Sequence, residues 1–416
     1  MLQLLSIIKA GYIIYYTVLM KKKKVALIIW GLQISGGGAR QILELALSLK
    51  RKGHHVDIFC IDLDREKCFP HLLKQLKVYS VNESSKKQTH HLAKYNLLQK
   101  TFNIIPHFIN KRHNLLQLRD LIKQVDARNH YDFFNYHETE VYKLAAYFDP
   151  SKNFWMMNDL FVKGESLPET WYRRWSHLEY RIKYRNKINK IIVLDNINKS
   201  IIKRYLHSDA VVVRSGLKQE DFYSKRIYKP KKNLSVLATG IFFPHRRFED
   251  LVKAMNILVN KKKLGNITLS IIGETRTDLQ YYLLVESLVK KYNLESYVKF
   301  LGRVTEEELK KQYKTSDIFV FPNNPQTWGL AVFEAMLSGC VAIVSRGAGA
   351  HEVLKDNQTA MLVDPESPTQ IATKIEILFN SYPLRKKIAT AGQDFVKKTI
   401  SWDKYAEEML SVFSQT

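Results

Sequence analysis

The chain has 416 residues, and its 65 Lys and Arg against 40 Asp and Glu give a formal net charge of +25. Hydrophobic residues make up 45% and charged residues 25% of the chain, proportions that fit a globular protein and exclude disordered, collagen-like and fibrous classes. At about 150 residues per domain, this length predicts two to three domains. The positive surplus suits an anionic partner, and nucleic acid, a membrane surface and phosphorylated substrates all meet that description.

Cysteine is rare in the chain. The three cysteines, Cys60, Cys68 and Cys340, show neither CxxC nor regular spacing. This pattern excludes a disulfide framework and a structural zinc site, and it is typical of a reducing cytosol. We therefore expect a cytoplasmic protein.

The first twenty residues are mostly apolar and run into four consecutive lysines, Lys21 to Lys24. Three interpretations compete. A membrane anchor has the right length, but Lys9 would cost about 2.5 to 3.5 kcal/mol near the bilayer centre; if the segment spans, the lysines place the rest of the chain in the cytoplasm. A cleaved signal lacks a basic start and a small-residue cleavage site. We favour the third, in which translation begins at Met20 and residues 1–19 reflect a misassigned start.

An alternation of strands and helices begins at Val25. The apolar run Val25–Trp30 predicts a strand buried on both faces of a parallel sheet. A glycine-rich loop, a helix that ends at Gly53 and a second strand complete a βαβ unit, whose loop lies at the ligand-binding edge of the sheet. Strands of this half are predicted at 56–61, 132–137, 154–159, 191–194 and 211–213. The polar stretch 68–128 predicts only amphipathic helices at 92–98 and 115–125.

A second alternation begins at Leu234. Strands are predicted at 234–240, 269–273, 298–302, 318–322 and 340–344, and helices at 248–258, 278–292, 306–313 and 329–338. Two Rossmann-like halves leave a cleft between domains, which is the usual place for a ligand. The predicted division is an N-terminal domain at 20–216, a linker at 217–233, a C-terminal domain at 234–398 and a final helix at 399–416.

The most informative stretch, Pro325–Met336, joins a strand end to a helix start. The free N–H groups of Leu330 and Ala331, in the first turn of that helix, suit a phosphate. Glu334 lies further along the helix and can accept hydrogen bonds from a diol such as ribose. On sequence alone, it is equally common for a glutamate on a helix to be an exposed carboxylate that binds no ligand.

From Val25 to its C-terminus, the chain resembles the family-4 glycosyltransferases. The family signature consists of two Glu separated by seven residues, followed by Ala-Met and then a Gly. In this chain Gln326 stands in the place of the first Glu, Glu334 is the second, and Ala335-Met336 and Gly339 follow. The stretches 347–353 and 360–365 also resemble the family pattern. The resemblance implies the α/β GT-B fold, with two Rossmann-like parallel-sheet domains facing across a cleft and a C-terminal helix that crosses back to the N-terminal domain. It also implies retaining transfer from a nucleotide-sugar without a metal or other cofactor.

The resemblance places the donor site in the C-terminal domain. Glu334 would bind the ribose, and Gln326 would hold sugar hydroxyls with an uncharged amide where the family has a carboxylate. The family's Gly-Arg pair reads Gly240-Ile241, so one cation is lost, and Arg246 takes the place of the family's Lys. Arg246, aided by Arg247, would grip the diphosphate. The other implied donor-side residues are Gly273, Arg303, Val304, Gly329, Leu330 and Ala331.

Residues of the N-terminal domain are implied on the opposite wall. His137 ends the strand at 132–137 and matches a family histidine that lines the sugar site, although a lone histidine is more often a packing residue. Gly37 and Gly38 would let the backbone approach the donor phosphate and the acceptor. Asn158 and Asp159, at another strand end, are acceptor-side candidates.

An apolar stripe of Trp171, Trp175, Leu178 and Ile182 lies on a helix rich in Arg and Lys. We interpret it as a core-packed stripe with a solvated basic face. The competing interpretation is a surface that meets anionic lipid, where each basic residue adds about 1 kcal/mol.

Two functions of different classes follow. The favoured one is a hexosyltransferase that uses a UDP- or GDP-sugar and a glycan or lipid-linked saccharide acceptor in cell-surface polysaccharide synthesis, in the cytoplasm and associated with the inner face of the membrane. The alternative is a binding protein for anionic membrane or nucleic acid that has lost catalysis, as Ile241 and Gln326 would suggest. The sequence disfavours nucleic acid, because it contains no recognisable nucleic-acid module. A sugar-nucleotide epimerase on a similar fold is a minor third possibility.

Overall fold

A computed structural model describes residues 22–83, 104–158, 167–226, 228, 230, 232–325 and 328–415. The chain forms two compact units. Unit 1 comprises Met1–Met157, Leu178–Ile191 and Phe413–Thr416, and unit 2 comprises Asn158–His177 and Ile192–Val412. The interpretations of residues 1–19 and the helix predicted at 92–98 lie outside the described residues.

The first sheet has seven strands in the order β3-β2-β1-β4-β5-β6-β7. They are β1 (Lys24–Leu32), β2 (His55–Leu63), β3 (Val78–Glu83), β4 (Phe133–His137), β5 (Asn153–Met156), β6 (Lys190–Val193) and β7 (Ala210–Val212). Strand β1 lies inside the sheet and pairs in parallel with β2 and β4, placing Val25 beside both Val56 and Phe133. Residues 25–29 are at most 1% exposed, which confirms a strand covered on both faces.

Helices and short turns connect these strands. They are α2 (Gly37–Arg51), α3 (Pro70–Leu73), α5 (Ile104–Asn129), η1 (Val141–Tyr147), η2 (Pro150–Lys152), α6 (Leu167–Glu179), η3 (Tyr180–Tyr184), η4 (Arg185–Lys187) and α7 (Asn196–Leu206). Both α2 and α5 pack on β2. The sequence does not predict β3, because this edge strand is polar and only half-buried and therefore lacks an apolar run.

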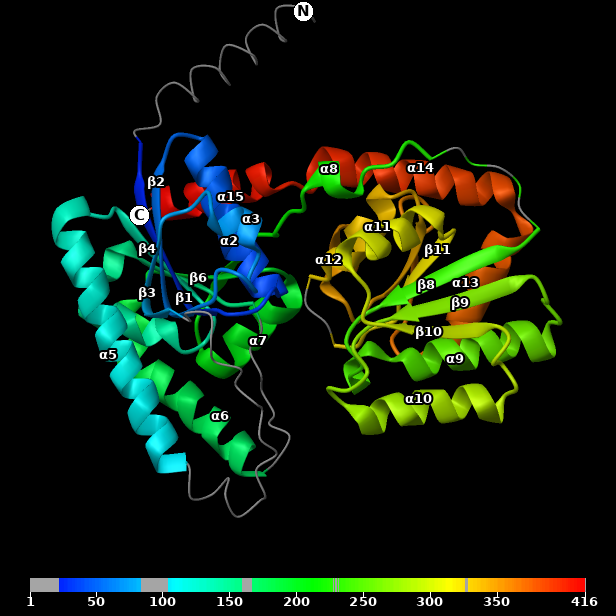
Figure 1. Ribbon diagram of the computed structural model, residues 1–416, viewed down its shortest axis with the longest axis horizontal. Helices are drawn as coiled ribbons and strands as arrows, with labels where there is room; N and C mark the ends of the chain where they lie inside the picture. Colours follow the sequence, from blue (N-terminus) through cyan, green and yellow to red (C-terminus); the bar gives the residue numbers. More distant parts are fainter. Residues whose placement is uncertain are drawn as a thin grey trace, which may run out of the picture. The chain divides into compact units, whose positions relative to one another are not determined.

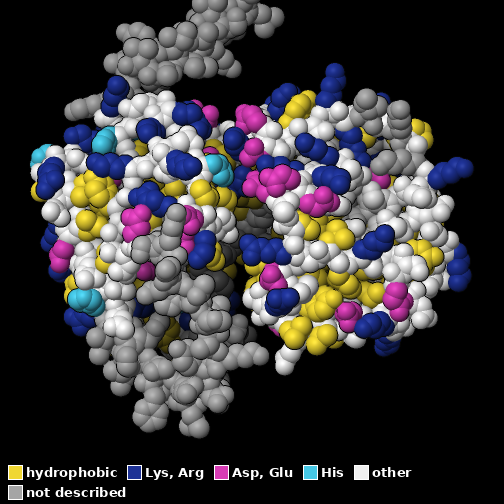
Figure 2. All heavy atoms as spheres, viewed as in Figure 1, with side chains coloured by type: hydrophobic (Ala, Val, Ile, Leu, Met, Phe, Trp, Pro, Cys, Tyr) yellow, Lys and Arg dark blue, Asp and Glu magenta, His cyan; other side chains and the backbone are white. Residues whose placement is uncertain are grey.

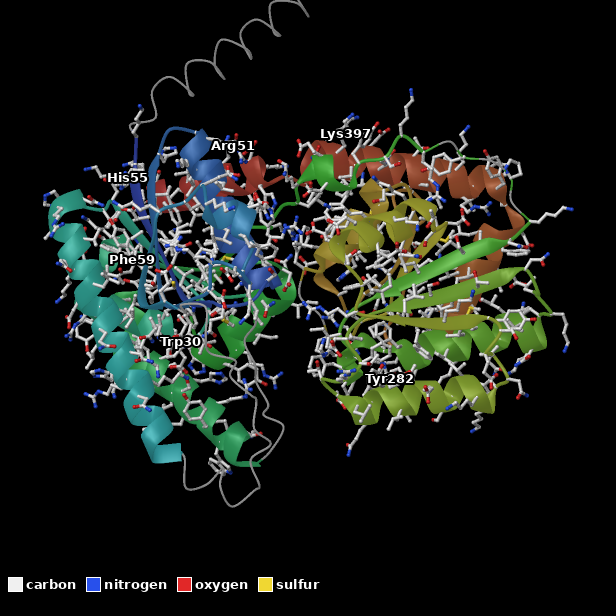
Figure 3. All side chains as sticks on the ribbon, in the orientation of Figure 1. Trp30, Arg51, His55, Phe59, Tyr282 and Lys397 are labelled. Atoms are coloured by element: carbon white, nitrogen blue, oxygen red, sulfur yellow. The ribbon has the colours of Figure 1, made fainter. Side chains whose placement is uncertain are left out.

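Aromatic side chains form much of the core of unit 1. Phe59 of β2 (Figure 3) stacks on Tyr79 at 5.1 Å between ring centroids and meets the edge of Tyr131 at 5.9 Å. Phe413, near the end of α15 (Trp402–Ser414), lies 5.4 Å from Phe133 and 4.8 Å from Phe154. The last turn of the chain is therefore part of the unit 1 core.

The second sheet has six strands in the order β10-β9-β8-β11-β12-β13, the order of a doubly wound fold. They are β8 (Leu234–Thr239), β9 (Ile267–Ile272), β10 (Val298–Gly302), β11 (Ile318–Phe321), β12 (Val341–Ser345) and β13 (Met361–Val363). Their resolved pairings are parallel, for example Val236 beside Leu269. The predicted class of two Rossmann-like parallel-sheet domains is confirmed.

Helices cover both faces of this sheet, with α9 and α10 on one side and α11 and α12 on the other (Figure 1). The elements are α8 (Gln219–Phe222), η5 (Pro244–Arg246), α9 (Phe248–Asn256), η6 (Ile257–Lys261), α10 (Leu279–Lys291), α11 (Glu306–Thr315), α12 (Leu330–Leu337), η7 (Gly349–Val353), α13 (Pro368–Asn380) and α14 (Tyr382–Thr399). Side-chain caps fix two helix starts: Asp278 accepts from the amide of Tyr281 at 3.0 Å, and Thr305 from that of Glu308 at 3.2 Å. Within the described ranges, no helix is both long and apolar enough to cross a bilayer.

The apolar stripe on α6 and η3 does not pack into a core. Trp171, Trp175, Leu178 and Ile182 are 67%, 65%, 37% and 72% exposed. Our preferred interpretation of a core-packed stripe is therefore wrong. The helix is anchored by its opposite face, where His177 and Tyr180 are buried.

Candidate functional site

Three glycines lie at the edge of the second sheet where β8, β9 and β10 end. Gly240 donates its N–H to the last residue of β9, and Gly273 donates to the carbonyl of Gly302, each at 2.9 Å. A Cβ on Gly273 would overlap the carbonyl oxygen of Gly240, so this position requires glycine. Because Arg303 and Val304 follow Gly302 directly, the structure brings these predicted donor-side residues to one edge.

The side chain of Arg246 lies against this edge. A Cβ built on Gly240 would approach Arg246 Nε to 3.0 Å and Cδ to 3.1 Å, so the missing side chain of Gly240 makes room for the guanidinium. Arg246 is half-buried at the end of η5, and its amide donates to the carbonyl of Phe243 at 2.9 Å. A cation in this position can meet a diphosphate above the sheet edge.

The neighbouring Arg247 is engaged by carboxylates of the chain itself. Its guanidinium lies 3.0 Å from Glu249, 2.8 Å from Asp250 and 3.5 Å from Glu366. These partners already balance its charge. These contacts leave Arg247 less available to a ligand than Arg246, and phosphate binding by either arginine stays a prediction.

Glu334 of α12 is tied to the same edge through a buried tyrosine. The hydroxyl of Tyr313 lies 3.2 Å from Glu334 Oε2 and 3.4 Å from Thr239 Oγ1, and Thr239 is the last residue of β8. Burial is the main cause that raises the pKa of Tyr313 well above its ordinary value, and the nearby charge of Glu334 adds to it. The hydroxyl therefore keeps its proton and can donate it in a hydrogen bond. Glu334 is half-buried, and the tyrosine fixes one of its oxygens.

The start of α12 is anchored by a buried tryptophan. Trp328 is 1% exposed, and its Nε1 donates to the carbonyl of Ser215 at 2.8 Å. Gly329 adopts a left-handed φ of +77°, a conformation that favours glycine. The first hydrogen bond of the following helix runs from the amide of Val332 to the carbonyl of Gly329, and the amides of Leu330 and Ala331 come before it in the chain. Gln326 lies outside the described residues.

His137 is completely buried at the end of β4. Its Nε2 lies 2.7 Å from Asn135 Oδ1, and since an amide oxygen only accepts, the ring donates there and keeps its proton on Nε2. Burial lowers the pKa of His137 to about 3, so the ring is neutral near pH 7. Nδ1 has no partner among the described residues and remains an acceptor. A role in lining the sugar site stays a prediction.

Glu138, which sequence analysis did not select, follows His137 in a left-handed conformation with φ 74°. Its backbone is held on both sides: the amide donates to Met156 at 3.2 Å, and the carbonyl accepts from Trp155 Nε1 at 2.8 Å. Burial raises the pKa of its carboxyl to about 7. Strained non-glycine residues and displaced pKa values concentrate at functional sites, so Glu138 joins the candidates. No sequence signal marks a left-handed glutamate.

The remaining predicted residues are less constrained. At the start of α2, a Cβ on Gly37 would meet nothing within 4 Å, so packing does not require glycine there; Gly38 follows it in the first turn. Asn158 is half-buried, and its Oδ1 has no hydrogen-bond partner within the described part of the chain. Asp159 lies outside the described residues.

Comparisons with known proteins show which family model and which folds this chain matches. Residues 219–395 match the family model described as "Glycosyl transferases group 1". An uncharacterized glycosyltransferase of Methanocaldococcus jannaschii is 27% identical over 227 residues, which cover 55% of this chain and 60% of that protein. The O-antigen chain mannosyltransferase RfbU of Salmonella typhimurium is 32% identical over 198 residues, covering 45% of this chain and 53% of the relative. These alignments thus span little more than half the length of either relative.

A solved structure extends the likeness to both sheets. HepE of Anabaena, determined in complex with UDP and with UDP-glucose, superposes with TM-scores of 0.69 and 0.66 at 13% and 14% identity. Each comparison covers 94% of this chain and 100% of the HepE chain. Likeness at this identity shows the fold, which is the GT-B fold. The chain therefore has the GT-B fold, and its residues 219–395 match the glycosyl transferases group 1 family model.

Proposed function

We propose that this protein is a retaining glycosyltransferase of family 4, which transfers a hexose from a UDP- or GDP-sugar to a glycan or lipid-linked saccharide. The observation that carries the proposal is the edge of the second sheet, where Arg246 lies against Gly240 and Glu334 is tied by Tyr313 to the end of β8. This pairing offers a cation for a diphosphate and a fixed carboxylate for a ribose diol. The UDP and UDP-glucose bound by HepE, and the similarity to the mannosyltransferase RfbU, support this substrate class.

In the proposed mechanism, the protein acts mainly by stabilising the leaving group, the nucleoside diphosphate. The guanidinium of Arg246 and the first amides of α12 stabilise the negative charge that develops on the departing diphosphate. An oxygen of that diphosphate then takes the proton from the acceptor hydroxyl, on the face of the sugar that the diphosphate leaves, so that the anomeric configuration is retained. The protein supplies orientation and charge, and the proposal requires no metal or cofactor.

We place this activity in the cytoplasm at the inner face of the membrane, in cell-surface polysaccharide synthesis. The similarity to RfbU, an O-antigen chain mannosyltransferase, supports a saccharide acceptor of this kind. A lipid-linked acceptor would require the enzyme to work beside a bilayer.

The test is a panel of UDP- and GDP-sugars incubated with the protein and a membrane extract, with released nucleoside diphosphate as the readout. We expect release from one donor and its loss in Arg246→Ala and Glu334→Ala. Arg204→Ala and Glu295→Gln, which change exposed residues away from the sheet edge, are the matched controls and should keep the wild-type rate. Release that survives in both site variants would refute the proposed site.

The alternative, a GT-B binding protein without catalysis, is favoured by one observation. Ile241 stands where the family has an arginine and is 43% exposed, so an apolar side chain replaces a cation beside Gly240. This reading predicts that UDP or GDP binds and that no donor is turned over with any acceptor fraction. Calorimetric binding beside the release assay separates the two functions.

A further inference from the structure

One continuous helical segment presents a stripe of large apolar side chains to solvent. The segment consists of α6, η3 and η4 and is called here the α6 segment. Trp171, Trp175, Leu178 and Ile182 follow one another at intervals of four, three and four residues, which places them on one face of a helix. Three of the four are at least 65% exposed, and exposed aromatic patches of this kind mark interaction surfaces.

Packing on the opposite face keeps this stripe outward. Tyr180 is 2% exposed, and its ring lies 5.3 Å from that of Trp155 and 5.6 Å from that of Tyr142. Turning the stripe inward would pull Tyr180 out of this aromatic cluster. The exposure of the stripe is therefore built into the fold of the segment.

Positive charge borders the stripe. The α6 segment, residues 167–187, contains six Lys and Arg and two acidic residues, Glu169 and Glu179. Glu179 is itself paired with Lys143 at 3.2 Å and with Lys183 at 3.5 Å. The exposed cations of the segment are Arg174, Lys183, Arg185 and Lys187. The guanidinium of Arg174 lies over the ring of Trp171 at 5.6 Å, beside the stripe.

An apolar stripe edged by cations fits one kind of surface best. Tryptophan prefers the boundary between hydrocarbon and water, and Lys and Arg beside it bind anionic headgroups. A single-stranded nucleic acid would stack on the tryptophans and meet the cations, but it would leave Leu178 and Ile182 in water. We propose that the α6 segment docks the protein on an anionic lipid surface, with Trp171, Trp175, Leu178 and Ile182 inserted at headgroup depth.

This inference deepens the proposed function, since it rests on the idea that the acceptor lies at a membrane. Its test is nevertheless independent of transfer, because vesicle binding needs neither donor nor acceptor. The two proposals can therefore fail separately.

The experiment is co-sedimentation of the full chain with vesicles of phosphatidylglycerol and phosphatidylcholine, and with vesicles of phosphatidylcholine alone. We expect binding to the anionic vesicles that weakens as salt rises. Replacing Arg174, Lys183, Arg185 and Lys187 by Gln should lower the partition coefficient by roughly a hundredfold or more, since each charge near the surface accounts for about fivefold. Trp171→Ser with Trp175→Ser should abolish the binding that persists at high salt.

Matched controls come from the second sheet's layer of helices, where exposed hydrophobic side chains gather over α10 (Figure 2). Leu283 and Leu284 are 50% and 51% exposed, so Leu283→Ser with Leu284→Ser removes comparable surface and should leave binding unchanged. Replacement of the exposed Lys261, Lys290, Lys291 and Lys299 by Gln matches the charge change. Equal losses in the control and α6 variants would overturn the proposal, as would failure of the wild type to bind anionic vesicles. Binding of a single-stranded oligonucleotide in preference to vesicles would also overturn it.

Discussion

Tyr313→Phe removes one hydroxyl from the proposed donor site and leaves the ring in place. The hydroxyl lies 3.2 Å from Glu334 Oε2 and 3.4 Å from Thr239 Oγ1, whereas the ring packs 5.7 Å from Phe319 and 6.1 Å from Phe222. The variant therefore keeps its apolar contacts and loses the group that orients the carboxylate.

The expected size of the effect follows from the charge on Glu334, which accepts the hydrogen bond from Tyr313. A hydrogen bond to a charged group contributes about 1.5 to 3 kcal/mol, against about 1 kcal/mol for a neutral pair. If about half of that free energy is transmitted to the ribose contact, the affinity for UDP or GDP should fall by about 0.75 to 1.5 kcal/mol, or roughly four- to twelvefold. The free energy of unfolding should fall by about 1 kcal/mol, because Glu334 is half-buried and water replaces part of the lost bond.

Isothermal titration calorimetry with UDP and GDP measures the affinity, and chemical denaturation measures the stability. The matched control is Tyr282→Phe on α10 (Figure 3), which removes a hydroxyl that donates to Glu286 at 3.0 Å. It should leave nucleotide affinity unchanged. Wild-type affinity in Tyr313→Phe, in a folded protein, would refute the assignment of Glu334 to the nucleotide.

Three further variants test other parts of the structure. Gly273→Ala places a methyl group against the carbonyl of Gly240, and we expect an unfolding free energy lower by about 3 kcal/mol and loss of nucleotide binding, measured by denaturation and calorimetry; unchanged stability would contradict the packing of the sheet edge. Glu138 has a carboxyl pKa raised from 4.5 to about 7, so the folded state binds this proton more tightly than the unfolded state, and stability should fall as pH rises from about 4.5 to about 7. Glu138→Gln should remove this fall, which denaturation curves across that range would reveal, and parallel curves for the two proteins would count against a buried carboxyl. Phe413→Ala removes a fully buried ring from the unit 1 core and should cost about 3 to 5 kcal/mol, measured by denaturation; a loss below about 1 kcal/mol would show that the end of α15 is not docked.

Much of the fold could be predicted because its strands are covered on both faces. Runs such as Val25–Trp30 and Ile318–Phe321 are continuous in the sequence and buried in the structure. The edge strand β3 escaped prediction because its half-buried residues alternate weakly. The full length of α5 escaped because a helix of mixed polarity has no clear periodic stripe.

The candidate site was only partly visible in the sequence. The family resemblance pointed to Gly240, Arg246 and Glu334. In the structure Arg246 lies against Gly240, and Tyr313 links Glu334 to the end of β8. Tyr313 could not be found, since one tyrosine on a helix looks like any packing residue until its hydroxyl is placed. The left-handed backbone of Glu138 depends on its contacts with the neighbouring strand, which no local pattern encodes.

The α6 segment shows a different limit. Its periodicity correctly predicted that four apolar side chains share one face, but an amphipathic pattern does not say whether that face meets a core or the outside. Tyr180 decides the matter, because its burial turns the stripe outward. The sequence pattern alone therefore does not decide between a stripe packed in a core and a stripe exposed to solvent.

The most direct test of the central claim follows the sugar itself. Each nucleotide-sugar of the panel is supplied with a labelled hexose, together with a membrane extract, and label in the glycan or lipid fraction is counted beside released nucleoside diphosphate. We predict that one donor gives equal amounts of both products and that Arg246→Ala and Glu334→Ala abolish both, while Arg204→Ala does not. Diphosphate release without label in any acceptor fraction, or transfer that survives both substitutions, would contradict glycosyl transfer at this site.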